Sequence, residues 1–327
     1  MEIVSKEFND VEAEEIAHLF NIVWCGQKFS AIVSKTKWAF YNNHSKVVLF
    51  ESGSELVAAR GSFKWPLAFN ETSLKTYQFH GTCVHPNFRR RGIFTSINNL
   101  FLQQAIENNF DLIFNVSVDN SRSGYEKLGW KYLKGFHRMT YANNPVKFIN
   151  RKFNAKKLEI NEDFKIDPAV EIATIEKTIP QEFLAARKIH FKNTITTNYT
   201  NDFLKWRLNN PSENYKIHRA EKCIVIYKVN FNVGMKELII GDFFMLEEQY
   251  KFFKECLKEI IEVEKPDLTY TYIFRHHPYF KYYLRFLFLP NPLNFHLNFG
   301  TKALNKKTEQ FLKDKKWSLG FLDIDTF

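Results

Sequence analysis

Hydrophobic residues recur along this chain with two spacings, one typical of helices and one typical of strands. Within residues 10–24, apolar side chains repeat at i, i+3, i+4 and i+7, which predicts an amphipathic helix with Asp10 as its candidate N-cap. Residues 45–52 and 55–63 are rich in apolar residues, and Gly53 lies between them. This arrangement predicts two strands joined as a hairpin.

A third strand is predicted for residues 76–84, which read TYQFHGTCV. After a basic turn, apolar residues return at helical spacing, so a helix is expected to begin near Gly92. The segment 110–118, FDLIFNVSV, is short and almost continuously apolar, as strands buried inside a sheet are. The order along the chain is therefore strand, turn, helix, strand.

The turn carries the densest positive charge of the chain. Arg89, Arg90 and Arg91 run directly into Gly92. Free N–H groups at the start of a helix, together with the helix dipole, attract anions. Glycine lets a ligand approach the backbone closely, and the arginines add charge. We therefore expect a site for a phosphate-bearing ligand here, in preference to a solvated basic turn.

Two stretches resemble a known family. VHPNFRRRGIF, residues 84–94, resembles the acyl-CoA-binding motif V-x-P-x-x-R-x-x-G-x-G/A of the GCN5-related N-acyltransferases (GNAT). NSRSGYEKLGW, residues 120–130, resembles a later segment of the same family. The predicted strand order fits the family from near residue 10 to near residue 140.

The resemblance implies a mixed sheet whose two central strands part. The pantetheine of acyl-CoA would lie in that gap, with its pyrophosphate on the backbone amides of the turn. It implies acyl-CoA as the acyl donor, either acetyl-CoA or one with a longer acyl group. The residues assigned to cofactor binding are Val84, Arg89, Arg90, Arg91, Gly92, Ile93, Phe94 and Asn120.

The sequence departs from the family pattern at two places. Phe94 stands where the family has a small residue, which alters how closely the helix start meets the pyrophosphate. The segment 120–125 is shorter than usual, although Tyr125 keeps its offset before Gly129.

Composition and charge bear on the number of domains, the class of partner and the location of the protein. At 327 residues, the chain is long enough for two domains, and its formal charge of +10 favours anionic partners. Basic residues are spread through both halves, so small-molecule substrates are favoured over nucleic acid. No apolar run is long enough for a membrane span, and the start of the chain lacks the features of a signal peptide. We expect a cytoplasmic protein, and the sequence leaves a homodimer open.

The cysteines are far apart and form no CxxC pair, so they are expected to be reduced thiols and not a disulfide framework or a zinc site. They are Cys25, Cys83, Cys223 and Cys256. The adjacent His276 and His277 would point to opposite faces of a strand, so no metal site is predicted.

The second half of the chain repeats the first. KWAFYNNHS, residues 37–45, recurs as KWRLNNPS, residues 205–212, and similar strands and a helix follow each copy. Where the first copy has its basic turn, the second reads GDFFMLEEQ, residues 241–249, which is acidic and should repel a pyrophosphate. We therefore predict an α/β (α+β) protein of two tandem GNAT-like domains. Residues 1–150 would bind acyl-CoA, and residues 151–327 would be a degenerate copy that contributes to the acceptor site.

Tandem domains of this kind resemble two groups of enzymes. One group acylates amino sugars linked to nucleotides, for surface polysaccharides. The other transfers amino acids from aminoacyl-tRNA to cell-wall precursors. The intact acyl-CoA motif favours the first group, as does the closing segment 317–327. An acyltransferase acting on another amine and a non-catalytic binding protein stay open as alternatives.

Amide formation needs a base for the attacking amine and a proton donor for the leaving thiolate. Strand alternation would place His80 and Val84 on one face of 76–84, and His80 is the nearest titratable group to serve as base. The alternative is a strand histidine bonded to backbone; His85 is a weaker candidate. Tyr125 fits the tyrosine general acid of the family, or else it is a packing aromatic. Cys83 as a nucleophile has no neighbouring base in the sequence.

The acceptor site is expected to use the repeated motif. Arg207 occupies a position where the first copy has Ala39, so folding does not demand a charge there. We expect Arg207, with Tyr215, to contact the diphosphate or base of the acceptor, because arginine pairs well with phosphate. Trp38 is the corresponding candidate in the first domain, and Trp206 is expected to anchor the core at the start of a strand.

Overall fold

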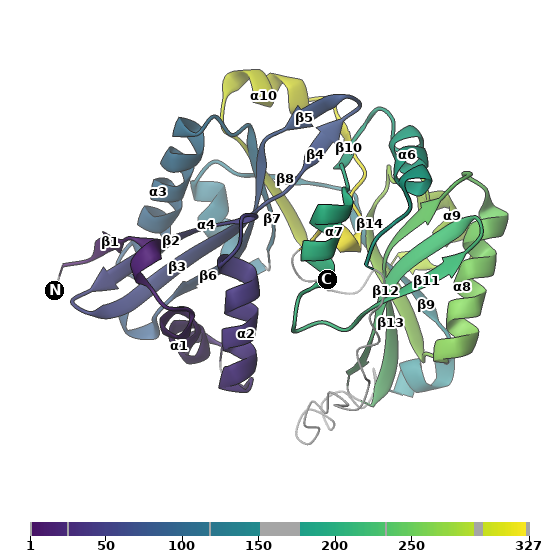
Figure 1. Cartoon of the computed structure of the whole chain (residues 1–327), viewed down its shortest axis with the longest axis horizontal. Coiled ribbons are helices and arrows are strands. Elements are labelled where there is room, and N and C mark those ends of the chain that lie inside the picture. Colours follow the sequence, from purple (N-terminus) through teal and green to yellow (C-terminus); the bar gives the residue numbers. More distant parts are fainter. Residues whose placement is uncertain are drawn as a thin grey trace. The chain divides into compact units, whose positions relative to one another are not determined.

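The computed structural model describes residues 2–24, 26–117, 119–150, 177–232, 234–290 and 297–324, which form two compact units (Figure 1). Unit 1 contains Met1–Lys134, Asn209–Ser212 and Leu297–Lys315. Unit 2 contains Gly135–Leu208, Glu213–His296 and Lys316–Phe327. Among the residues described, no helix is long and apolar enough to cross a membrane.

Unit 1 is built on a seven-stranded sheet in the order β1-β2-β3-β6-β7-β16-β8. The β6–β7 pair is parallel and the other neighbours are antiparallel. The strands are β1 (Val4–Lys6), β2 (Ser45–Ser52), β3 (Glu55–Lys64), β6 (Thr76–Val84), β7 (Leu112–Ser117), β16 (Asn298–Ala303) and β8 (Lys131–Leu133).

Helices flank the sheet of unit 1. They are α1 (Ala13–Val23), α2 (Phe29–Phe40), α3 (Ile93–Glu107), α4 (Asp119–Lys127) and α10 (Lys306–Leu312); the short elements are η1 (Phe8–Asp10), η2 (Pro86–Phe88), β4 (Leu67–Phe69) and β5 (Thr72–Leu74). The helices α1, α2 and α3 each bury apolar residues. Phe79 of β6 packs in the cluster that contains the buried residues of α3, whereas its neighbour His80 stacks on Phe40 of α2. Successive strand residues point to opposite faces, so α2 and α3 cover opposite faces of the sheet.

The predicted start of α1 is wrong by two residues. Asp10 ends the short helix η1, and α1 is capped instead by Glu12. The Glu12 side chain accepts from the backbone of Glu15 while the Glu15 carboxylate accepts from the Glu12 N–H, so two free N–H groups are satisfied together.

Unit 2 is built on a six-stranded sheet in the order β11-β12-β13-β14-β9-β15. The strands are β11 (Tyr215–Ala220), β12 (Cys223–Asn232), β13 (Met235–Met245), β14 (Leu268–Phe274), β9 (Phe136–Ala142) and β15 (Leu289–Pro290). The helices are α6 (Gln181–His190), α7 (Asn201–Leu208), α8 (Tyr250–Glu264) and α9 (Phe280–Arg285); β10 (Thr194–Thr197) pairs with β17 (Lys316–Trp317), and η3 (Phe321–Asp323) follows.

The two units share one frame, which confirms the predicted fold of two GNAT-like domains. In unit 1 the order β2, β3, β6, α3, β7 follows the first copy of the repeat, and in unit 2 the order β11, β12, β13, α8, β14 follows the second. The central strands of each unit pair in parallel over three residues, Thr76–Gln78 with Leu112–Phe114 and Glu237–Ile239 with Leu268–Tyr270. Beyond these residues the two strands are no longer paired.

The repeated KW motif lies at the end of a helix in both copies, so Trp206 is not at the start of a strand as predicted. Trp38 is on the last turns of α2, and Trp206 is on the last turn of α7. The asparagines that follow form the turn into β2 or β11. Local strand and helix propensities do not separate the end of a helix from the start of the next strand when the connecting turn is this short.

The compact units do not follow the consecutive ranges 1–150 and 151–327, because each takes a strand from the other half of the chain. The strand β16 comes late in the sequence and lies between β7 and β8 of unit 1. The strand β9 comes before residue 150 and lies between β14 and β15 of unit 2. Hydrophobic periodicity identifies a strand but does not say which partner it pairs with, so this exchange is invisible in the sequence pattern.

Candidate acyl-CoA site in unit 1

The site begins where β6 and β7 part. Opposite β3, Gly61 pairs with His80 and Ala59 pairs with Cys83, so β6 has one more residue than β3 over this stretch. The extra residue forms a β-bulge at Gly81, whose φ of 56° is left-handed. The bulge bends β6 at the point where the parallel pairing with β7 has ended.

The bulge overturns the prediction that His80 and Val84 share a face. One inserted residue shifts the alternation, so each residue beyond the bulge points to the opposite side from the one expected. Val84 packs with Phe79 in the cluster beneath α3. The His80 ring instead stacks on Phe63, with ring centroids 3.7 Å apart, on the α2 side. His80 is half-buried between aromatic rings, and its role as base stays a prediction.

The predicted anion site is formed by the turn after β6. Arg90 and Gly92 both have left-handed backbone, with φ of 62° and 77°. Gly92 is the N-cap of α3, and no side chain caps this end of the helix. The first N–H groups of a helix have no partner inside it, so here they remain available to a ligand. A Cβ built at Gly92 would meet nothing within 4 Å, so glycine is required by the backbone conformation and the space beside it is open.

The three arginines of the turn are exposed, and two of them are oriented by local contacts. Arg89 donates from Nε to the carbonyl of Val84 at 3.3 Å. The Arg91 guanidinium lies over the ring of Phe88, 5.1 Å from its centre. Their charges are therefore held beside the open helix start. A diphosphate fits this donor set, because exposed guanidinium groups and backbone N–H groups are the partners that phosphate oxygens prefer.

Phe94, the large residue at a position that is small in the family, is accommodated by Gly124 of α4. A Cβ at Gly124 would lie 2.9 Å from Cε1 of the Phe94 ring. The same ring packs edge-on against Tyr125, with centroids 5.3 Å apart. The missing side chain at position 124 thus makes room for the extra ring at position 94, and Ile93 is buried in the cluster beneath α3.

Tyr125 of α4 is buried in the same hydrophobic cluster as Phe79 of β6. Its ring packs 5.0 Å from that of Trp130, and its hydroxyl oxygen accepts a hydrogen bond from Arg60 of β3. The sequence signal that points to Arg60 is its place as the one arginine inside the mostly apolar strand ELVAARGSF. The side chain of Asn120, in the first turn of α4, lies outside the described residues, so its contact with the cofactor stays a prediction.

Cys83 is buried in β6, and burial raises the pKa of its thiol to about 12. The thiol is protonated near neutral pH, and protonated thiols are poor nucleophiles. The geometry therefore favours direct attack of an amine over an acyl-enzyme on Cys83. Within the described parts of the chain, no group of three or more His, Cys, Asp or Glu side chains is placed to hold a metal ion; Cys25 lies outside those parts.

The structure does not gather the residues predicted for the acceptor around an open site. Trp38 is half-buried and packs edge-on against Phe63 at 5.5 Å. Arg207 is fully buried in unit 2, where it donates to the carbonyl of Ile324 at 2.6 Å and to the Tyr215 hydroxyl at 3.1 Å. These contacts favour a structural role for Arg207 and Tyr215, and their contact with an acceptor stays a prediction.

In unit 2 the turn between β13 and α8 has the opposite chemistry. Its N-cap, Gln249, has a φ of −124°, so it needs no glycine. Glu247 and Glu248 stand before the helix, and Glu248 pairs with Lys281 at 2.7 Å. Two carboxylates thus occupy the region that three arginines occupy in unit 1.

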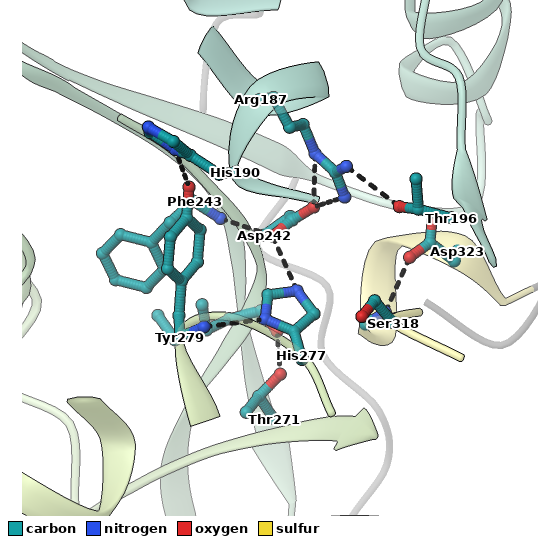
Figure 2. A network of polar contacts seen from close by, with 12 residues as sticks. Arg187, His190, Thr196, Asp242, Phe243, Thr271, His277, Tyr279, Ser318 and Asp323 are labelled. Carbon is teal, nitrogen blue, oxygen red and sulfur yellow. Dashed lines mark hydrogen bonds and ion pairs between the residues drawn. The ribbon is translucent and has the colours of Figure 1, made fainter. Parts of the chain in front are cut away.

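The strand β13 also has a bulge, at Gly241, and the next residue, Asp242, belongs to a buried polar network (Figure 2). Arg187 donates from Nη2 to Asp242 at 2.6 Å, and His277 faces the other Asp242 oxygen at 3.6 Å. Burial alone would raise the pKa of Asp242, but the Arg187 guanidinium outweighs it and holds the pKa below its usual value. Burial raises the pKa of Asp323, which accepts from the Tyr199 hydroxyl. All five side chains are almost inaccessible to solvent.

The chain was compared with known proteins. The acetyltransferase (GNAT) domain family matches residues 5–133. Among solved structures, a GCN5-related N-acetyltransferase from Kribbella flavida has a TM-score of 0.64 and 11% identity, over 94% of this chain and 72% of its own. One from Anabaena variabilis has a TM-score of 0.62 and 9% identity, over 94% of this chain and 74% of its own. A search among curated proteins found no match.

Identities this low show a shared fold and no more, so the similarity of sequence rests on the family match. That match covers the whole stretch from β1 to β8, including the bulge, the basic turn and α4. Residues 5–133 therefore match an acetyltransferase domain of the GNAT type, which supports an acyl-CoA-dependent N-acyltransferase.

Proposed function

We propose that this enzyme transfers an acyl group from acyl-CoA to the amino group of a nucleotide-linked amino sugar, by direct attack of the amine in a ternary complex. The observation that carries the donor half is the left-handed turn of Arg89 to Gly92 at the uncapped start of α3. The acceptor half is supported by the net charge of +10, which suits a second substrate that also carries a diphosphate.

On this proposal, some residues of unit 1 bind the cofactor and others transfer protons. The turn and the first amides of α3 bind the pyrophosphate, and Phe94 packed on Gly124 sets the position of the helix start. His80 would take a proton from the attacking amine nitrogen, and Tyr125 would give its hydroxyl proton to the leaving sulfur. The bond that forms joins nitrogen to the acyl carbon, and the bond that breaks joins that carbon to sulfur. Bound acyl-CoA supplies the activated thioester.

The test is a panel assay of the purified full-length chain. Several acyl-CoAs are combined with several amino-sugar nucleotides, and free thiol release is measured. We expect release that depends on one class of amine and falls when Arg89 and Arg91 are both changed to alanine. Glu247→Ala with Glu248→Ala, at the acidic turn of unit 2, is the matched control and should leave activity unchanged.

Other results would replace the proposal. Turnover with simple amines, and none with amino-sugar nucleotides, would assign another acceptor. Consumption of aminoacyl-tRNA without any response to acyl-CoA would favour the peptidyl-transfer class. A protein that consumes neither donor would be a binding protein.

A further inference from the structure

The polar group closest to the Tyr125 hydroxyl is the Arg60 guanidinium. We propose that Arg60 is a positioning residue that fixes Tyr125, so that the tyrosine O–H points to the sulfur of bound CoA. This inference rests on the proposed function, because it concerns the proton donor of that reaction. It adds a residue outside both motifs that the sequence singled out.

The position of Arg60 is fixed by packing and by hydrogen bonds together. It is 1% exposed, and its guanidinium lies flat over the Phe79 ring, 3.9 Å from the centre. Its Nε and Nη2 donate to Oδ1 of Asn98, at 3.1 and 2.7 Å. The same Nη2 donates to the hydroxyl oxygen of Tyr125.

The orientation of Asn98 follows from its other contact. Its Nδ2 donates to the carbonyl of Phe94 at 2.7 Å, one turn earlier in α3, so its oxygen must face Arg60. Arg60 is thereby tied to the first turn of α3, the part of the helix that carries the cofactor turn. The contacts run from Phe94 through Asn98 and Arg60 to Tyr125.

A guanidinium has donors and no acceptor, so the Tyr125 oxygen accepts from Arg60 and cannot direct its own hydrogen there. The hydroxyl hydrogen must point elsewhere around the oxygen. Phe94 and Trp130 are packed against the ring of Tyr125 and offer no strong acceptor in that direction. A sulfur placed in the gap between β6 and β7 would be an acceptor for this hydrogen.

The fixed positive charge has a second consequence. When the carbon–sulfur bond breaks, the electron pair stays on sulfur, and the Tyr125 proton moves to it. The negative charge then lies on the Tyr125 oxygen, which already accepts from Arg60, so no group has to reorient. The proton lost by the attacking amine returns to Tyr125 through solvent, which balances the cycle.

The test compares the affinity of CoA with that of desulfo-CoA by calorimetry, which requires neither an acceptor nor turnover. If the Tyr125 O–H bonds to sulfur, the wild-type chain should prefer CoA by about threefold to tenfold, the value of one hydrogen bond. Tyr125→Phe should abolish this preference while the affinity for desulfo-CoA stays as it was.

Arg60 is tested with two variants, since removing it alone leaves the Asn98 oxygen buried without its partner. Arg60→Met combined with Asn98→Leu replaces both partners by apolar groups of similar size. This double variant should lose the CoA preference as fully as Tyr125→Phe. Arg60→Lys keeps the charge and should keep part of the preference. Once an acceptor is known, both should lower kcat by a larger factor than they raise the KM for acyl-CoA.

Three outcomes decide the matter. A double variant that still prefers CoA, while Tyr125→Phe does not, would show that Arg60 is only a structural contact. A Tyr125→Phe chain that keeps the preference would show that the hydroxyl does not face sulfur, and this also overturns the inference. If the wild-type chain binds neither CoA nor desulfo-CoA, the proposed function fails first, and that result is distinct from the other two.

Discussion

Unit 1 and unit 2 have the same backbone frame and opposite chemistry at the end of the central strand. In both units, the strand before the turn has one residue more than the antiparallel strand it pairs with. The extra residue is a glycine, Gly81 in β6 and Gly241 in β13. Both strands then lead into a fifteen-residue helix, α3 or α8. The turns between strand and helix differ: unit 1 has left-handed backbone at two residues together with arginines, and unit 2 has no left-handed residue there and has glutamates.

The two bulges differ as well. Beside Gly81, His80 is half-buried between aromatic rings. Beside Gly241, Asp242 is fully buried and paired with Arg187. In unit 2 the residue after the bulge is held by the chain's own side chains, and the turn that follows has no arginine. The comparison indicates that packing keeps the frame, and we expect binding to depend on a few residues at the turn.

The largest effect is expected in unit 2. Asp242→Ala leaves the Arg187 guanidinium buried without its carboxylate, so the free energy of unfolding should fall by about 3–5 kcal/mol. The exposed pair of Lys281 and Glu248 is the control, and Glu248→Ala should cost less than about 1 kcal/mol. Urea denaturation followed by circular dichroism measures both. Equal stability of the Asp242→Ala and wild-type chains would mean that the network does not hold unit 2 together.

The next effect should appear in unit 1 as lost affinity. Changing Arg89 and Arg91 to alanine removes charge-assisted contacts to phosphate, so the Kd for CoA should rise by about tenfold to a hundredfold. Calorimetry should show one site per chain in the wild type. Glu247→Arg with Glu248→Arg should not create a second site, because unit 2 also lacks the left-handed glycine. A second site in that variant would break the comparison, since charge alone would then suffice.

Phe94 and Gly124 allow a finer test of how the turn is held. Gly124→Val should push the Phe94 ring away and cost about 1–3 kcal/mol of stability, as overpacking does. Combining it with Phe94→Ala should recover part of that loss, because the two side chains compete for one space. Thermal denaturation of the two single variants and the double variant gives the coupling. If the effects of the two substitutions on stability are purely additive, the side chains at positions 94 and 124 do not compete for one space.

The sequence predicts most of the frame and the position of the basic turn, for physical reasons that can be named, and the binding of a cofactor at that turn stays a prediction. Residues 76–84 and the helix after Gly92 were recognised because their periodicity is local, and the turn was recognised because its glycine and arginines are contiguous. The bulge at Gly81 was missed, because a single inserted residue leaves the composition of the strand unchanged. Arg60 and Asn98 were missed because their contact joins a strand and a helix far apart in sequence. The exchange of β9 and β16 was missed for the same reason.

The smallest effect concerns the pH dependence of unit 2. Burial lowers the pKa of His277 below its ordinary value, although the Asp242 carboxylate opposes the shift. The folded chain therefore keeps His277 neutral at pH values where the unfolded chain already binds a proton. Stability should fall as the pH drops below the unfolded pKa of about 6.5, by at most about 1.4 kcal/mol per pH unit, and should level off once the folded state is protonated too.

His277→Asn is the matched variant for this prediction. The Nδ1 atom of His277 accepts from the backbone N–H of Tyr279 at 3.2 Å, and an asparagine oxygen makes the same i to i+2 contact elsewhere in the chain, as at Asn210 with Ser212. The variant should therefore keep the turn and lose the titration. The charged groups that face His277 are Asp242, Arg187 and Asp323, and the variant keeps all three. Urea midpoints between pH 7.5 and 5.5 should fall less for the variant than for the wild type. Parallel curves would assign the pH dependence to other groups and would contradict the prediction for His277.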